Sequence, residues 1–404
     1  MTVTTLQPNR RVLLAGAFGQ SNPGDEALLG AFARALPDHV AVVASAAPEQ
    51  TTAEHGLAAV RRDDAVALAR TLASVDAVVV AGGTIFKTLH PAAGRARHAL
   101  LARTAALAAV SRALRKPLAL VGVGAGALDG AVARRLARFI VRSSDLLVLR
   151  DDESADRLAE AGAPAPFRVG SDAAWTLVGA PAGETTEERA TAIAMRGAGG
   201  RLATVEIDEA APEAPVVVAL SHLAGGDDLA ARLAEGLEPV AAERELHLQP
   251  WQTDVGHGGD EALAADVAQR LGDHATVVAP PKDLLDARER FADVGLVVAL
   301  RFHAIPAAAA AGTPVLGVAH EPKLAGAARR LGQPTVPATA APDQLSSAVL
   351  DALDGPAPDA EAVAAECDRA EEGFRLLRVL LARGRSDEAA DVDGLPLRPE
   401  EWLG

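Results

Sequence analysis

The chain has almost no thiols and no tyrosine. Its 404 residues include one cysteine, Cys367, two methionines and three tryptophans. A single thiol can form neither an intramolecular disulfide nor a metal site built from several thiolates, and it is typical of a reducing compartment. The ten histidines are scattered without the spacing of metal ligands. We therefore predict a cytoplasmic protein with no metal site.

Long hydrophobic runs and an excess of basic charge are also missing. Arg and Asp interrupt the alanine-rich stretches, so no apolar segment reaches the roughly 20 residues that span a bilayer. Residues 1–9 lack the charged-then-apolar pattern of a signal peptide. The formal net charge of −15 disfavours nonspecific capture of nucleic acid or of an anionic membrane, although transient membrane contact stays compatible with the sequence. Any anionic ligand therefore needs a local basic site.

Short runs rich in Val and Leu alternate with helical patterns along the first 180 residues, and a second such series begins at Pro215. This alternation predicts parallel sheets covered by helices on both faces. With 49% apolar residues, the chain can fill two hydrophobic cores. We therefore predict an α/β protein with two Rossmann-like domains facing a cleft, the GT-B architecture. A ligand site is expected between the carboxyl ends of the two sheets.

The predicted boundaries follow changes in composition. We expect an N-terminal domain over 1–180, a linker or insertion over 181–214 and a C-terminal domain over 215–355. The apolar positions within 356–385 recur mostly at three- and four-residue steps, which predicts an amphipathic helix that packs across the domains. An acidic tail over 386–404 is assigned no structure.

Three basic side chains follow a predicted buried strand at 294–299. Arg301 and His303 come directly after it, and Lys323 comes in the next loop. Basic groups at the carboxyl end of a parallel strand usually meet a ligand. No nucleophile stands beside His303, so the cluster offers anion capture and one proton donor and disfavours a hydrolase. The structural alternatives are a core histidine bonded to backbone and a solvated lysine.

Glycine-rich turns follow three predicted strands of the first half, at 16–24, 81–83 and 122–126. The first opens a helix with Asp25 and Glu26 at the favourable end of the helix dipole. It is not a Walker loop, because no Gly-Lys-Ser/Thr follows. Each turn could instead be a tight strand-to-helix connection, and the two carboxylates could simply cap the helix.

Two further charged residues of the first domain are candidates: Arg150 is predicted at the tip of a strand, and Asp172 is predicted to face the cleft. The alternatives to ligand binding are an Arg paired with a carboxylate at a helix start and a turn or cap residue. Residues 257–261, His-Gly-Gly-Asp-Glu, imitate the His-Gly-Gly of some glycosyltransferases. Their early place in the second half favours a loop with Asp260 as a helix cap.

In their order along the chain, these segments resemble the signatures of the polysaccharide pyruvyl transferase family. In the first half, residues 22–28 match the N-terminal Gly-Asn-x-Gly-Asp-Glu-Ala signature, 81–83 the glycine triplet, 150–154 the Arg-Asp-x-x-Ser segment and Asp172 the Asp-Pro-Ala-like turn. In the second half, residues 301–304 match the Arg-x-His-Ala signature and 321–326 the late Asp-x-Lys-x-x-Gly. The resemblance covers most of the chain. It departs at Ser21 and Ala81, where Gly is usual, and at His320-Glu321, where Tyr-Asp is usual, so an aromatic platform for a sugar is missing there.

The resemblance implies a GT-B enzyme that uses phosphoenolpyruvate as donor substrate and no cofactor. Pyruvate passes to two hydroxyls of a glycan, as a ketal, and phosphate is released. We assign protonation of the methylene carbon of phosphoenolpyruvate to His303. The carboxylate and the phosphate of phosphoenolpyruvate are assigned to Arg301, Lys323 and Arg150 for binding. The residues predicted to line the acceptor side or the cleft are Asn22, Gly24, Asp25, Glu26, Gly82, Gly83 and Asp172.

The acceptor implied in this way is a glycan, such as a cell wall glycan, or a lipid-linked sugar, with no nucleic-acid partner. Two other functions remain open. One is a nucleotide-sugar-dependent glycosyltransferase or epimerase of the same fold, although the sequence lacks a convincing late Glu that would hold a ribose. The other is a non-catalytic glycan- or anion-binding protein.

Overall fold

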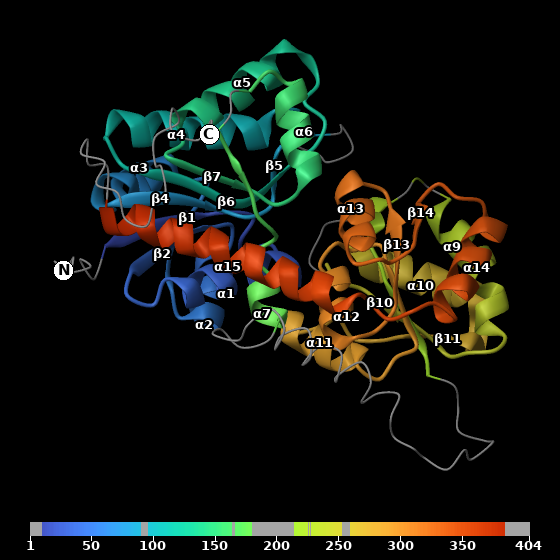
Figure 1. Cartoon of the computed structure of the whole chain (residues 1–404). Helices are drawn as coiled ribbons and strands as arrows, with labels where there is room; N and C mark the ends of the chain where they lie inside the picture. Colours follow the sequence, from blue (N-terminus) through green and yellow to red (C-terminus); the bar gives the residue numbers. More distant parts are fainter. Residues whose placement is uncertain are drawn as a thin grey trace. The chain divides into compact units, whose positions relative to one another are not determined.

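The computed structural model describes residues 10–89, 96–163, 166–179, 214–224, 226, 228–252 and 259–383. These residues fall into two compact units (Figure 1). Unit 1 is drawn from Met1–Gln20, Leu28–Ala173 and Arg369–Gly404, and unit 2 from Ser21–Ala27 and Ala174–Asp368. The predicted linker, apart from Ala214, and the predicted acidic tail lie outside the described residues.

Unit 1 contains a parallel sheet with the strand order β3-β2-β1-β4-β6-β7-β8, and β5 pairs with β6. The inner strands are short runs of mostly small or branched apolar residues, because both faces of the sheet are covered. The strands are β1 (Arg11–Ala15), β2 (Val40–Ser45), β3 (Ala58–Arg61), β4 (Ala77–Ala81), β5 (Thr84–Phe86), β6 (Leu118–Ala125), β7 (Leu146–Leu149) and β8 (Arg168–Val169).

Helices cover the two faces of this sheet. On one face the core joins side chains of the strands to those of α3, α4, α5 and α6. On the other, Phe374 of α15 meets Phe32 of α1 edge-on, with ring centres 4.9 Å apart. The helices are α1 (Pro23–Ala35), α2 (Pro48–His55), α3 (Ala65–Ser74), α4 (Ala99–Ala113), α5 (Gly130–Ser143), α6 (Asp152–Glu160) and α15 (Ala360–Arg383).

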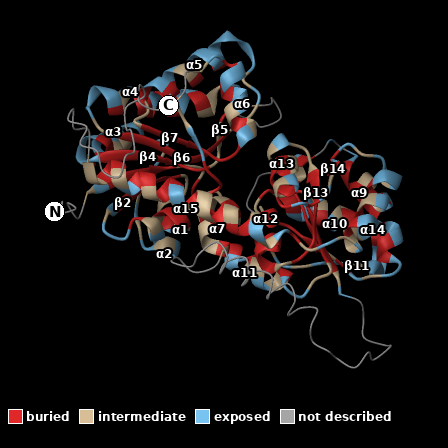
Figure 2. Ribbon diagram, in the orientation of Figure 1, coloured by how far each residue is buried: buried red, intermediate tan, exposed pale blue. Residues whose placement is uncertain are grey.

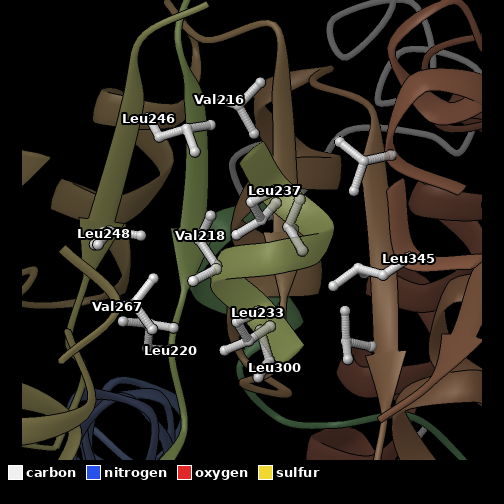
Figure 3. Close-up of a cluster of buried hydrophobic side chains, with 14 of the residues drawn as sticks. Val216, Val218, Leu220, Leu233, Leu237, Leu246, Leu248, Val267, Leu300 and Leu345 are labelled. Carbon is white, nitrogen blue, oxygen red and sulfur yellow. The ribbon is translucent and has the colours of Figure 1, made fainter. Parts of the chain in front are cut away.

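Unit 2 contains a second parallel sheet, with the order β11-β10-β9-β12-β13-β14. Alternate strand residues such as Val218 and Leu248 point into a core shared with α9, α10 and α14 (Figure 3). The strands are β9 (Val216–Ala219), β10 (Leu246–Gln249), β11 (Ala275–Val277), β12 (Leu296–Ala299), β13 (Val315–Ala319) and β14 (Thr335–Pro337). The helical segments are α7 (Trp175–Val178), η2 (His222–Ala224), α9 (Leu229–Ala241), α10 (Gly259–Leu271), η3 (Gly272–His274), α11 (Leu284–Phe291), α12 (Ala304–Ala311), α13 (Pro322–Arg330) and α14 (Pro342–Leu353).

The inner strands of both sheets are almost wholly buried (Figure 2), whereas β3, β8 and β11 at the sheet edges are not. The α/β class and the two Rossmann-like sheets predicted from the alternating pattern are therefore confirmed. In unit 2 the chain runs from β9 outward to β11 and then returns to β12 on the other side of β9. This reversal creates a switch point between the carboxyl ends of β9 and β12, where α/β sheets commonly bind ligands.

The units differ from the predicted boundaries in three places. The second unit takes over at Ala174, inside the predicted N-terminal domain of residues 1–180. Ser21–Ala27, the first turn of α1, belongs to unit 2, whereas the rest of that helix belongs to unit 1. The predicted C-terminal helix is α15, whose residues contribute to both units. The physical reason is packing, because Gly24 lies against a side chain of unit 2. Among the described residues, no helix is both long enough and apolar enough to cross a bilayer.

Candidate functional site

A buried ion pair marks the switch point of unit 2. Arg301 follows β12, and Asp260 stands in the first turn of α10 with none of its side chain exposed. Nη2 of Arg301 donates to both carboxylate oxygens of Asp260 at 2.7 and 2.6 Å, and Nε donates to Oδ2 at 3.0 Å. Nε also reaches the carbonyl oxygen of Leu220 at 3.2 Å. The guanidinium is thereby held in one orientation at the end of the strand.

Asp260 accepts further hydrogen bonds from the loops that end β9 and β10. The backbone N–H and the ring Nδ1 of His222 lie 2.8 and 2.6 Å from Oδ1. The backbone N–H groups of Trp251 and Gln252 donate to Oδ2 at 3.1 and 2.8 Å. Burial alone raises the pKa of Asp260, but the His222 hydrogen bonds, the charge of Arg301 and the backbone donor of Gln252 outweigh it and lower that pKa to about 2. This carboxylate is therefore a permanent anion that connects the ends of three strands.

Sequence reasoning missed the role of Asp260 and of His222. Asp260 was predicted to cap its own helix, whereas its side chain accepts from residues 222, 251, 252 and 301. The helix cap prediction is therefore wrong, because these donors come from distant strand ends that no local pattern reveals. A signal for His222 did exist, since it closely follows β9 just as Arg301 closely follows β12.

His303 comes two residues after Arg301, at the start of α12, and its ring packs against the backbone of Gly24. A Cβ atom added to Gly24 would lie only 2.0 Å from Nδ1 and 2.6 Å from Cγ of His303. Real Cβ atoms do not approach so closely, so position 24 admits no side chain while the imidazole stays there. The glycine of the N-terminal signature is thus explained by close approach to His303. Both residues belong to unit 2.

The residues around Gly24 bring a carboxyl group to the same place. Nδ2 of Asn22 donates to Oδ2 of Asp25 at 2.7 Å, and the N–H of Gly24 donates to Oδ1 of Asn22 at 3.2 Å. Burial raises the pKa of Asp25, although the charges of His303 and Lys323 oppose the rise. The charge of Glu26 adds to the rise. Asp25 therefore retains a proton to higher pH than an ordinary aspartate.

The Phe302 ring lies next to both Lys323 and His303. Nζ of Lys323 is 5.8 Å from the centre of the Phe302 ring and 2.7 Å from a carboxylate oxygen of Glu321. The Phe302 ring in turn meets the His303 imidazole edge-on, with ring centres 5.1 Å apart. Unit 2 thus brings together Arg301, His303 and Lys323 with Asn22, Gly24, Asp25 and Glu26. The N-terminal signature was assigned to the first domain, and the structure places it in unit 2, against His303.

Arg150 belongs to unit 1, whereas Arg301, His303 and Lys323 belong to unit 2. The buried side chain of Arg150 donates from Nε to Asp151 at 2.9 Å and lies 3.7 Å from Asp172. Nη2 of Arg150 also donates to Thr84 at 3.3 Å. The pKa of Asp151 is lowered, since the charge of Arg150 and hydrogen bonds from Ser154 outweigh burial. Arg150 therefore has the arrangement named above as its structural alternative, because Asp151 is the carboxylate at the start of α6.

Gly82 and Gly83 follow β4 in unit 1 with φ values of +65° and +76°. Only glycine adopts this left-handed region without strain. A Cβ added to Gly82 would also lie 2.8 Å from Cδ1 of Leu28. The turn between β4 and β5 therefore requires glycine for its own geometry, and a ligand role for the pair stays a prediction.

Comparison with known proteins gives a family and a fold. The family model described as polysaccharide pyruvyl transferase matches residues 22–322. No curated protein sequence matches the chain. Among solved structures, HepE of Anabaena in complex with UDP is 11% identical with a TM-score of 0.57, covering 92% of this chain and all of that one.

Two further structures are similar in the same way. MnaA of S. aureus, solved with UDP, is 11% identical with a TM-score of 0.57, covering 92% of this chain and 97% of that one. A putative UDP-N-acetylglucosamine 2-epimerase from Listeria monocytogenes is 12% identical with a TM-score of 0.60, covering 95% of this chain and all of that one. Identities this low establish the fold alone, which is GT-B-like with two Rossmann-like domains.

Proposed function

Because the chain belongs to the polysaccharide pyruvyl transferase family, we propose that it transfers pyruvate from phosphoenolpyruvate to two hydroxyls of a glycan and releases phosphate. The acceptor is a glycan or a lipid-linked sugar, and the reaction belongs in the cytoplasm. One observation carries the proposal. The signature turn at Asn22–Asp25 packs on His303, beside Arg301 and Lys323, so residues from distant parts of the chain form one group in unit 2.

The chemistry needs one positioned acid and a site for a donor with two anionic groups. His303 gives a proton to the methylene carbon of phosphoenolpyruvate, which leaves positive charge at C2. A glycan hydroxyl adds at C2 and loses its proton. The C2–O bond to phosphate then breaks with protonation of the phosphate. The second hydroxyl adds at C2, loses its proton and closes the ketal. Two hydroxyls and one phosphoenolpyruvate thus give one ketal and one phosphate.

Arg301 suits the donor because Asp260 fixes its orientation. Asp260 occupies Nε and Nη2, and no hydrogen bond joins Nη1 to any described residue. The free edge can donate to a carboxylate or a phosphate. Lys323 supplies the second cationic group. We assign Asp25 to the acceptor hydroxyls, where a carboxyl group of raised pKa can hold or take up a proton.

A nucleotide-sugar-dependent enzyme is the competing function, favoured by the fold that the chain shares with proteins solved with UDP. The two functions predict different ligands. We expect phosphoenolpyruvate to raise the melting temperature of the chain and UDP to leave it unchanged, because binding to the folded state stabilises it by mass action. Stabilisation by UDP and not by phosphoenolpyruvate would contradict the proposal.

The proton donor is tested with His303→Gln, which keeps the size of the side chain and removes its acidity. We expect phosphoenolpyruvate still to stabilise the variant, while phosphate release with acceptor falls about 100-fold or more. Candidate glycans and lipid-linked sugars are screened by phosphate release. The matched control is His274→Gln, an exposed histidine of η3 in the same unit. Turnover of His303→Gln equal to that of the control would remove the acid role from His303.

A further inference from the structure

Basic charge is segregated along part of this acidic chain. Between Arg97 and Ser144 there are nine Arg or Lys residues and one acid, Asp129, although the whole chain has a formal net charge of −15. This segment forms α4, β6 and α5 of unit 1, and the two helices pack against each other. We call the exposed residues of α4, α5 and the turn after α4 the α4–α5 surface: Arg103, Arg112, Leu114, Arg115, Val132, Arg134, Arg135, Phe139 and Arg142.

The arginines of this surface face solvent without neutralising partners in the described part of the chain. No ion pair joins Arg134, Arg135 or Arg142 to a described carboxylate. The single acid of the segment, Asp129, is itself 3.6 Å from Arg97. Some arginines on other helices are paired with an acid of the same helix, as Arg270 is with Asp266 and Arg375 with Glu372. The positive charge of the surface is therefore available to an external anion.

Apolar side chains are interleaved with these arginines. Val132, Arg135, Phe139 and Arg142 recur at three- and four-residue steps, so they form one stripe along α5. Val132 is 52% exposed, Phe139 39% and Leu114, just after α4, 44%. The opposite side of α5 packs on the sheet through small and branched residues, and its outer side is pale blue in Figure 2. Exposed apolar groups interleaved with cations suit a partner that is both anionic and apolar.

We propose that the α4–α5 surface docks on an anionic membrane surface. Guanidinium groups meet the lipid phosphates, while Phe139, Val132 and Leu114 reach the boundary of the acyl chains. A nucleic acid would satisfy the arginines and leave the apolar stripe in water, which favours the lipid surface. The inference goes beyond the proposed transfer reaction, and it brings the chain to the place where a lipid-linked acceptor resides.

The test is cosedimentation of the full chain with vesicles at about 0.1 M salt. We expect binding to vesicles of phosphatidylcholine containing about one third phosphatidylglycerol, none to phosphatidylcholine alone, and loss at about 0.5 M salt. Arg135→Gln with Arg142→Gln should weaken binding at least about 10-fold, since each arginine contributes separately near the surface. Phe139→Ser should weaken it several-fold without changing charge.

The matched control is Arg270→Gln with Arg375→Gln, which removes the same charge from an exposed and a half-exposed helix position outside the surface. This double variant should bind the anionic vesicles as the parent chain does, and circular dichroism checks that every variant is folded. Equal binding by the two double variants would overturn the proposal. An absence of binding to anionic vesicles would also overturn the proposal. This includes the outcome in which the chain binds duplex DNA through Arg135 and Arg142 and does not bind vesicles. No phosphoenolpyruvate enters this assay, so its outcome is separate from that of the proposed reaction.

Discussion

Asp260 is the residue on which the geometry of unit 2's switch point depends. It holds Arg301 in place and accepts from His222, Trp251 and Gln252 while fully buried. A buried carboxylate with this many donors is costly to replace, because each donor would lose its acceptor. Asp260 acts through Arg301, and it is therefore a positioning residue in the proposed reaction.

Asp260→Asn replaces one accepting oxygen by an NH2 group, which faces N–H donors and cannot accept from them. We expect a loss of about 3 kcal/mol in the free energy of unfolding at pH 7, measured with urea, because one partner of a buried pair is removed. Affinity for phosphoenolpyruvate should fall as well, since Arg301 loses its support. The control, Asp266→Asn, changes a half-exposed acid of the same helix and should stay within about 0.5 kcal/mol of the parent.

The difference between the parent and Asp260→Asn should depend on pH. The pKa of Asp260 is about 2 in the folded chain, below its ordinary value of 3.8. Such a group stabilises the fold above pH 4, and this contribution, about 2 kcal/mol, is lost as the pH falls toward 2. The gap between the two proteins should therefore narrow from pH 5 to pH 2. A gap that stays constant would show that Asp260 is not the ionised partner.

The sequence predicted part of this site for a simple reason. Arg301 and His303 directly follow a strongly apolar strand, and the carboxyl end of such a strand is a local feature. Asp260 is 41 residues from Arg301 and 38 from His222, so their contact depends on how β9, β10 and β12 are ordered in the sheet. The periodicity of apolar residues along the chain does not reveal the order of these strands in the sheet.

At the scale of elements, α15 encloses the single thiol. Cys367 is completely buried, and its Sγ lies 3.6 Å from the carbonyl oxygen of Trp175. A Cβ added to Gly179 would lie 2.5 Å from Sγ, so the backbone after α7 also closes on the sulfur. The state of this thiol therefore reports whether α15 is packed against α7.

Cys367 should not react with Ellman's reagent in the folded chain and should react fully in urea. The physical reason is that a buried thiol is reached only when its surroundings open. The positive control places Arg375→Cys on the same helix in a Cys367→Ala background, at a half-exposed position that should react at once. Fast reaction of Cys367 in the folded parent would contradict the packing of α15.

The amphipathic pattern of 356–385 predicted a helix, and α15 spans Ala360–Arg383. What the pattern does not contain is the division of that helix between two units, or the transfer of Ser21–Ala27 to unit 2. Both depend on tertiary packing, such as the fit of the His303 ring on Gly24. Periodicity describes which face of a helix is apolar and leaves open what covers it.

At the scale of the whole molecule, each unit has its own hydrophobic core. Leu120 lies in the core of unit 1 and Leu248 in that of unit 2 (Figure 3), and both are fully buried. We expect Leu120→Ala and Leu248→Ala each to cost about 3 kcal/mol of unfolding free energy in urea. The double variant should lose their sum within about 0.5 kcal/mol, because the two residues share no partners. A much smaller combined loss would mean that the cores are coupled.

Totals over the chain do not show how charge is distributed on its surface. The net charge of −15 predicts little attraction to anionic surfaces, yet α4 and α5 carry an almost purely basic face. A sum over the sequence averages charges that folding sorts onto different surfaces. The alternation of apolar runs and helical patterns did predict the two parallel sheets of the molecule. Each buried strand and each covering helix leaves its own local pattern in the sequence.

Trp251 gives the switch point of unit 2 an optical property. The chain has no tyrosine and only three tryptophans, so its ultraviolet emission comes from Trp175, Trp251 and Trp402 alone. The Trp251 ring is buried and donates to Gln249 at 3.1 Å, while its backbone N–H donates to Asp260. An anion that neutralises Arg301 changes the electric field at this indole. Occupancy of Arg301 can therefore be followed by intrinsic fluorescence, in real time and without a label.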